Sequence, residues 1–274
     1  DKFLRTNCTV SFCHIGEGMA KILSKKGFYS TPMGYEAVID LQTFNPTWRT
    51  HRWLMMTRKK ASKELVVKEQ RCSDVLEDDF CRIDKKWCGS KKQSFKNQAF
   101  LTRPILFKQQ PGVRYFFAYE NDSMVGFRLF DPMYKDGRVY GYAASISRYD
   151  PDTVSGCSTF LLLEGIDVFK KEGLSELSLG LSPFKLNSLD QHKQEDVVIS
   201  ERIKLSMLTF YLFKCFFRMN GFFYSFNGIS LYNSHFKARA RAVYFASKQN
   251  LPLFSIIYSY LNTINPFSLF FKKS

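Results

Sequence analysis

The sequence predicts an α+β fold in which a mixed, mostly antiparallel sheet carries packed helices. Three β-rich runs with short turns between them lie in the second half of the chain: residues 113–121, 123–131 and 138–147. The Asp136-Gly137 pair is a typical hairpin turn. An apolar helical pattern over 158–172 and a strand over 174–182 follow. Three strands, a helix and a further strand in this order predict a sheet with a helix packed on it.

The first half of the chain has a less regular pattern. Residues 16–28 predict a helix that ends at Gly27, and residues 37–41 predict a short strand. A basic helix is predicted to begin at His51, and the apolar run 65–67 predicts the start of another strand. These elements again mix helices with short strands, as an α+β fold requires.

The segment 71–98 is highly charged and mixed in sign, which indicates a surface excursion. A change in composition after it suggests a domain boundary. We therefore expect a domain over 1–105, a second over 106–250 and an aromatic tail over 251–274 that suits a membrane interface.

The charge of the chain indicates a polyanionic partner. Forty Lys and Arg residues against 25 Asp and Glu residues give a net charge of +15, which favours nucleic acid, anionic lipid or a phosphorylated substrate. Residues 202–248 contain eight Lys and Arg residues and no acid, interleaved with aromatic residues. That block fits a single-stranded tRNA end, an anionic membrane surface, or a core helix with snorkelling lysines.

The spacing of the cysteines and the hydropathy of the chain indicate its cellular compartment and its relation to a membrane. The seven cysteines have no paired spacing, which suits free thiols in a reducing compartment, and no metal site is expected. The uncharged run 249–271 contains two prolines and several polar residues, so it predicts a packing or interfacial segment rather than a membrane span. We expect a cytoplasmic protein at the inner face of the cell membrane, and a membrane domain before Asp1 in a longer protein stays open.

Five motifs occur in a fixed order along the chain. They are GYEAVIDLQTF (34–44), HRWLMMTRKKASKE (51–64), SISRYDPDTVSG (145–156), ELSLGLSPF (176–184) and YSFNGISLYNSHFKAR (224–239). Together they resemble the C-terminal synthase domain of phosphatidylglycerol lysyltransferases, the multiple peptide resistance factor family. The resemblance implies tandem acetyltransferase-like (GNAT-type) domains around a shared tunnel. It also implies transfer of an aminoacyl group from aminoacyl-tRNA to a lipid hydroxyl, with no metal and no coenzyme A, and a role in resistance to antimicrobial peptides.

Candidate site residues combine this resemblance with the needs of acyl transfer. The reaction needs positioning, a proton acceptor and a positive group for the developing oxyanion. The predicted catalytic residues are Arg148, Lys237, Glu120 and His235. The predicted substrate-binding residues are Glu164, Ser182, Arg239, Arg241, Tyr232 and Asp152. Arginine can also clamp a phosphate with two hydrogen bonds.

Structural roles compete with these assignments. Arg148 has carboxylates nearby for an ion pair, Asp150 and Asp152, and Glu164 suits a structural pairing on its apolar helix. Ser182 lies in a strand that Gly180 and Pro183 can simply shape. His235 is more often structural than catalytic, and the stripe from Lys237 to Arg241 also fits a solvated face.

Several positions depart from the family pattern. Ser145 and Thr159 stand where the family has acidic residues, and four extra residues lie between Phe226 and Phe236. Two alternatives therefore stay open. One is an acyl-CoA-dependent N- or O-acyltransferase on the same fold, although the chain lacks the expected pyrophosphate-binding loop. The other is a catalytically inactive relative that binds tRNA or a membrane.

Overall fold

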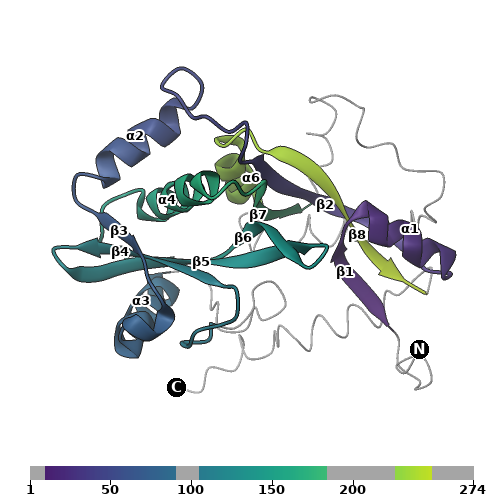
Figure 1. Ribbon diagram of the computed structural model, residues 1–274, viewed down its shortest axis with the longest axis horizontal. Coiled ribbons are helices and arrows are strands. Elements are labelled where there is room, and N and C mark those ends of the chain that lie inside the picture. Colours follow the sequence, from purple (N-terminus) through teal and green to yellow (C-terminus); the bar gives the residue numbers. More distant parts are fainter. Residues whose placement is uncertain (1–9, 91–104, 184–225, 249–274) are drawn as a thin grey trace. The chain divides into compact units, whose positions relative to one another are not determined.

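A computed structural model describes residues 10–90, 105–183 and 226–248 of the 274-residue chain (Figure 1). The chain forms two compact units. The first unit comprises Asp1–Ala37, Leu181–Asn233 and Arg239–Asn262, and the second comprises Val38–Gly180, Ser234–Ala238 and Thr263–Ser274. The strands are hydrogen-bonded in the order β1-β8-β2-β7-β6-β5-β4-β3. The predicted α+β class, with a mostly antiparallel sheet and helices, is confirmed, whereas the predicted boundary at residue 105 stays a prediction.

The second unit is built on the predicted antiparallel meander. Its strands are β4 (Arg114–Glu120), β5 (Ser123–Lys135) and β6 (Arg138–Tyr149). Both connections are two-residue turns with positive φ: 46° and 64° at Asn121 and Asp122, then 51° and 75° at Asp136 and Gly137. Positive φ at both central residues matches the right-handed twist of a hairpin. The residues at these two turns therefore determine where the chain forms its hairpins.

A helix and a parallel strand complete the predicted order. Helix α4 (Cys157–Lys171) follows β6, and β7 (Glu176–Pro183) then pairs with β6 in parallel. The rings of Phe116, Phe130 and Phe169 meet edge to face between the meander and α4. Gly165 allows this close approach, because an added Cβ would lie 2.6 Å from the Phe130 ring. Helix α4 is thus held on one face of the meander.

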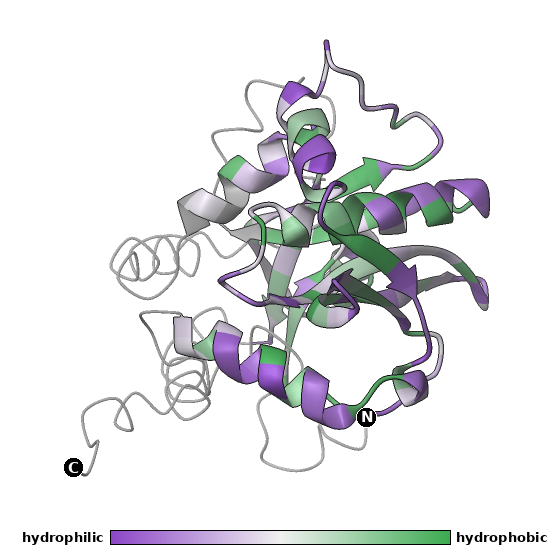
Figure 2. Ribbon diagram, turned by 90° about the vertical axis from the view of Figure 1, so that its left-hand side faces the viewer, coloured by the Kyte–Doolittle hydropathy of each residue, from purple (hydrophilic) through white to green (hydrophobic). Residues whose placement is uncertain are grey.

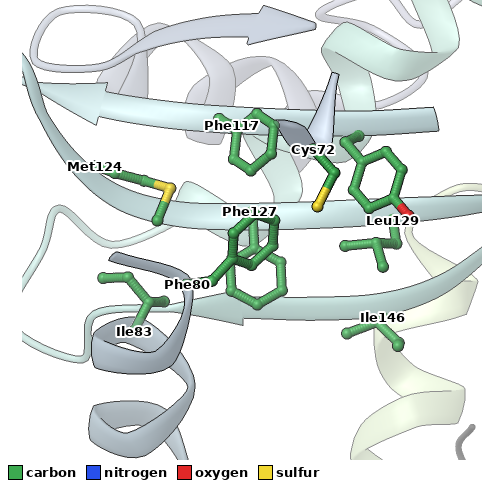
Figure 3. Packing of buried hydrophobic residues seen from close by; sticks show 9 residues of the cluster. Cys72, Phe80, Ile83, Phe117, Met124, Phe127, Leu129 and Ile146 are labelled. Carbon is green, nitrogen blue, oxygen red and sulfur yellow. The ribbon is translucent and has the colours of Figure 1, made fainter. Parts of the chain in front are cut away.

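The other face of the meander is covered by α3 (Glu77–Ser90), as Figure 1 shows. Phe80 and Ile83, one helical turn apart, are almost completely buried. They pack into a cluster that Figure 3 shows from close by, with Cys72, Tyr115, Phe117, Met124, Phe127, Leu129 and Ile146. In Figure 2, α3 is the lowest helix, and short hydrophobic patches interrupt its hydrophilic surface.

The prediction that 71–98 is a surface excursion was therefore wrong over its described part. A 3-10 turn, η2 (Cys72–Asp74), and α3 occupy residues 72–74 and 77–90. The physical reason is that two buried residues per two turns are enough to anchor a helix, even when the rest of its surface is charged. The high content of charged residues in this segment made its narrow apolar stripe difficult to recognise from composition.

Helix α2 (Arg52–Ala61) and strand β3 (Val66–Glu69) complete the second unit. Leu54 and Ala61 are fully buried on the inner side of α2, and β3 pairs antiparallel with β4. Both the basic helix after His51 and the strand near 65–67 are confirmed. Arg52, Lys59 and Lys60 are exposed cations on the outer side of α2, and Trp53 and Met56 are exposed apolar residues there.

The first unit contains β1 (Ser11–Ile15), α1 (Glu17–Lys25), most of β2 (Tyr29–Asp40), most of α6 (Phe226–Ser234) and β8 (Arg239–Ser247). Strands β1 and β8 are antiparallel. Ala20 packs on Tyr244, and Leu23 packs with Phe28 and Ala246. The helix predicted over 16–28 is confirmed, but β2 begins eight residues earlier than the strand predicted from Ala37.

None of the helices in the described ranges is long and apolar enough to cross a membrane. The aromatic tail over 251–274 and most of the basic block over 202–248 lie outside the residues that the structure describes. The expectations about them stay predictions.

Candidate active site

Arg148 is held rigidly near the end of β6. It lies opposite Phe127 of β5 and two residues after Ile146, so its side chain emerges on the face that α3 covers. Its Nε donates to Asp84 Oδ1 at 2.8 Å, and its Nη1 donates to the Ser147 carbonyl oxygen at 3.0 Å. The guanidinium carbon lies 4.0 Å from the centre of the Trp87 ring.

This anchoring leaves one end of the Arg148 guanidinium available. Its side chain is only 13% exposed, and within the described residues Nη2 has no hydrogen-bond partner. Asp84, Ser147 and Trp87 fix the plane of the group and leave Nη2 to bind an anion. The expected carboxylate partners Asp150 and Asp152 are not used. Strand β6 extends beyond the predicted end at residue 147 and includes Arg148.

The turn after β6 has its own ion pair. Lys86 of α3 donates to Asp150 Oδ2 at 2.6 Å, and the Asp152 N–H donates to Asp150 Oδ1 at 3.1 Å. Burial opposes ionisation of Asp150, but these hydrogen bonds and the positive charge of Lys86 outweigh it and lower the pKa of the carboxyl. Asp152 itself is exposed. Its backbone therefore serves the turn, and its carboxylate faces solvent.

Glu120 lies beside the same turn. It ends β4, and its Oε2 accepts a hydrogen bond from Thr153 Oγ1 at 3.3 Å. The structure thus brings Glu120, Arg148 and Asp152 to the strand ends and the loop that precede α4. Cys157, the first residue of that helix, is not a nucleophile at neutral pH, because burial raises its pKa to about 12.

A second group of site candidates gathers around the start of α2. The His235 ring stacks on Trp53, with centroids 4.2 Å apart and planes 15° apart. Lys237 follows two residues later with a φ of 48°, in the turn before β8, and its side chain is exposed. His51, which the sequence analysis passed over as a site residue, has its pKa lowered by burial and then by the charge of Lys237. His235 and Lys237 therefore share a site with His51.

Two threonines link His51 to the loop before α2. His51 Nδ1 lies 2.8 Å from Thr50 Oγ1, which lies 2.8 Å from Thr47 Oγ1. The Thr47 and Thr50 side chains also accept each other's backbone N–H, both at 3.2 Å, which stabilises the turn into the helix. The imidazole is thereby held in place, and its low pKa keeps it neutral at physiological pH.

The lowered pKa of His51 predicts a pH dependence of stability. Burial and Lys237 lower this pKa from 6.5, while a hydrogen bond with the Phe236 backbone opposes them. The unfolded chain therefore binds more protons below pH 6.5, so the stabilising contribution of His51 is present above pH 6.5 and is lost as pH falls. We expect His51→Gln to lose less free energy of unfolding than the wild type between pH 7 and pH 5.5. Urea titrations across this range check it, and parallel pH curves would contradict it.

Glu164 has a structural pairing. Arg58 Nη2 of α2 donates to Glu164 Oε1 and to Asp167 Oδ2, both at 2.6 Å. All three side chains are about one-third exposed, so the cluster joins α2 to α4 near the surface. Glu164 is already paired with Arg58. This favours a structural role for Glu164 over recognition of a substrate ammonium group.

The other predicted substrate-binding residues lie in or at the edge of the first unit. Arg239 and Arg241 share one face of β8, and Arg241 Nη1 lies 3.6 Å from Glu36 Oε2. Tyr232 lies in α6. Ser182 lies near the end of β7, and its side chain falls outside the described residues. Arg239 and Arg241 therefore lie on an extended strand, and their roles stay predictions.

The two positions where the family has acids hold neutral groups with structural surroundings. Ser145 Oγ donates to the Leu129 carbonyl oxygen at 3.2 Å, and Thr159 is buried in the first turn of α4. Nearby, Ser158 Oγ accepts from Arg128 Nη2 at 2.7 Å and lies 2.9 Å from Ser147 Oγ. Ser158 therefore links Arg128 to Ser147 at the beginning of α4.

Sequence reasoning missed Asp84, Trp87 and His51. Asp84 and Trp87 lie on α3, in the segment that its charge assigned to the surface, yet their spacing of three residues places them on one helical face. The only sequence feature that singled out His51 was its position just before a basic helix. Across the described ranges, no group of three or more His, Cys, Asp or Glu side chains could hold a metal ion.

Comparison with known proteins places this geometry in a family. The family described as "Phosphatidylglycerol lysyltransferase, C-terminal" matches residues 1–247. A comparison with curated proteins finds no match. Among solved structures, the C-terminal domain of a putative lysylphosphatidylglycerol synthetase from Agrobacterium fabrum is 15% identical with a TM-score of 0.63, covering 90% of this chain and 71% of that one.

Two further solved structures share the fold. L-PGS from Bacillus licheniformis is 17% identical with a TM-score of 0.69, and the match covers 96% of this chain and 75% of that one. A conserved protein of unknown function from Bacteroides thetaiotaomicron is 9% identical with a TM-score of 0.54, with 90% and 72% covered.

Proposed function

Because the chain belongs to the family of phosphatidylglycerol lysyltransferase C-terminal domains, we propose that it transfers an aminoacyl group from aminoacyl-tRNA to an anionic lipid. The acceptor is the hydroxyl of phosphatidylglycerol or of a related lipid. The family match over residues 1–247 carries this proposal. Family membership supports an acyl or aminoacyl transferase in general. The net charge of +15 supports binding of a polyanionic tRNA and of an anionic lipid surface.

Arg148 supplies the positive group that this chemistry needs. Attack on the donor ester forms a C–O bond to the acceptor oxygen, places negative charge on the carbonyl oxygen and then releases the tRNA ribose oxygen. A guanidinium already fixed by Asp84, Ser147 and Trp87 requires no reorganisation to bind an oxyanion or a phosphate. Its Nη2, which has no hydrogen-bond partner among the described residues, donates to that group.

Lys237 and His51 supply a second polar centre. The positive field of Lys237 helps to keep His51 neutral, and a neutral imidazole accepts a proton where an imidazolium does not. Thr50 and Thr47 hold the imidazole in place, and the proton that His51 takes from the acceptor hydroxyl then passes to the departing ribose oxygen. Under this proposal, His51 rather than His235 takes the acceptor's proton, and His235 supports Trp53.

A transfer assay with the purified protein tests the proposed function. The protein is incubated with radiolabelled aminoacyl-tRNAs and phosphatidylglycerol, with and without prior RNase treatment. We expect label in extracted lipid only when intact tRNA is present, and the labelled amino acid identifies the donor. Label transferred from acyl-CoA instead, or binding of tRNA without transfer to any lipid, would overturn the proposal.

The proposed reaction also implies where in the cell the protein acts. Both substrates meet at the cytoplasmic face of an anionic membrane, so we place the protein there. Resistance to cationic antimicrobial peptides would follow from the product, because an added aminoacyl ammonium group reduces the negative charge of the lipid surface.

A further inference from the structure

One exposed face of α2 combines cations with large apolar side chains. Its residues recur at helical spacing and line an open groove of about 770 Å³, together with Trp48 from the preceding loop and with Lys63 and Glu64 from the turn after the helix. We call this surface the α2 face. It consists of Trp48, Arg52, Met56, Lys59, Lys60, Lys63 and Glu64.

We propose that the α2 face docks the protein on the headgroups of an anionic phospholipid bilayer. This goes beyond the transfer reaction, because docking recognises surface charge and needs neither tRNA nor an acceptor hydroxyl. Five of the seven residues favour such a surface by charge or by aromatic character: Trp48, Arg52, Lys59, Lys60 and Lys63.

The apolar members of the α2 face point to lipid. Trp48 is 50% exposed and Met56 is 52% exposed, and Trp53 on the neighbouring side of α2 is 40% exposed. Indole rings are enriched at the level of lipid headgroups, where one edge meets water and the ring meets the acyl region. An exposed methionine among lysines gains from contact with acyl chains and gains little from phosphates. Cations around exposed apolar groups are typical of helices that lie in the membrane interface.

The same residues are poorly arranged for stacking nucleobases. Single-stranded RNA binds to aromatic rings whose faces are open. Lys59 Nζ already lies over Trp48, 5.9 Å from the ring centre, and His235 covers one face of Trp53. One face of each indole is thus occupied within the protein. Their exposed edges remain suited to a headgroup layer, so the observations favour a bilayer over RNA.

Charge sets the expected size of the effect. Each Lys or Arg near an anionic leaflet contributes about 1 kcal/mol, or about a fivefold change in partitioning. The α2 face carries four such residues and one acid, Glu64. Removing three lysines should therefore weaken vesicle binding by about 100-fold, and the loss should shrink as salt is added.

Vesicle flotation without tRNA tests the docking surface. Wild-type protein, the triple variant Lys59→Gln/Lys60→Gln/Lys63→Gln and Trp48→Ala are mixed with phosphatidylcholine vesicles containing phosphatidylglycerol or phosphatidylserine. We expect wild-type binding to follow vesicle charge with either anionic lipid, and both variants to bind more weakly. Phosphatidylserine lacks the glycerol headgroup, so binding to it separates docking from acceptor recognition. The assay measures no transfer, so failure of the proposed reaction would leave this result readable.

A matched variant controls for net charge. Lys25→Gln/Lys26→Gln/Lys135→Gln removes three exposed lysines from α1 and the β5 turn, and we expect it to bind vesicles nearly as well as the wild type. Equal losses in the two triple variants would show that only total charge matters and would overturn the proposal. So would loss of tRNA binding in the α2 variant with vesicle binding unchanged. A blue shift of indole emission on vesicle binding that Trp48→Phe removes would support it.

Discussion

Replacing Arg148 with alanine should lower kcat/KM for aminoacyl transfer by about 100- to 1,000-fold, the usual effect of removing one fixed donor to a developing oxyanion. The structure explains why the loss should be large. Asp84, Ser147 and Trp87 hold the guanidinium with its Nη2 unpaired in the described chain, so water cannot reproduce its position. Initial rates with labelled aminoacyl-tRNA and phosphatidylglycerol measure the effect.

Arg148→Lys should recover only part of the activity. A lysine keeps the positive charge but loses the planar fork that binds Asp84 and Ser147 while it stacks on Trp87. Asp84→Asn and Trp87→Phe leave the arginine in place and loosen its orientation. We expect each to give a smaller loss of kcat/KM than Arg148→Ala.

Arg82→Ala provides the matched control. Arg82 also lies on α3, bonds Asp79 and the Met124 carbonyl oxygen, and has a side chain 41% exposed. The Arg82→Ala substitution removes an arginine contact between α3 and the meander and leaves Arg148 unchanged. Activity lost equally in Arg82→Ala and Arg148→Ala would show that α3 packing, rather than the Arg148 guanidinium, is responsible.

Local rules predicted the meander well because each signal acts over a few residues. The Asp136-Gly137 turn and the apolar alternation on either side specify a hairpin without help from distant segments. The apolar pattern of α4 likewise ends near Gly173, where φ is positive. The extent of β2 was less visible, because its first half contains Pro32 and Gly34, which weaken a strand pattern.

The candidate site was less predictable, because its residues meet only through tertiary packing. Arg148 was identifiable from a motif, but its partners Asp84 and Trp87 lie more than 60 residues earlier in a segment whose charge concealed a helix. The meeting of His51 with Lys237 joins positions nearly 190 residues apart. No spacing rule along the chain predicts such contacts.

Phe80→Ala should produce the largest loss of stability, about 3–5 kcal/mol in the free energy of unfolding. Phe80 is 1% exposed, and its ring lies 5.7, 5.2 and 4.7 Å from those of Phe107, Phe117 and Phe127. Truncation therefore removes aromatic contacts and leaves a cavity between α3 and the meander (Figure 3). Urea unfolding followed by circular dichroism measures the change.

Leu76→Ala is the control that decides what this loss means. Leu76 stands just before α3 and is 73% exposed, so its truncation should change stability by less than about 0.5 kcal/mol. If Phe80→Ala were equally mild, α3 would be a loosely attached surface helix, as its charge suggests. In that case Asp84 and Trp87 could not fix the Arg148 guanidinium, and the catalytic role argued for Arg148 would lose its structural basis. A large loss for Phe80→Ala alone supports both the core and the site that depends on it.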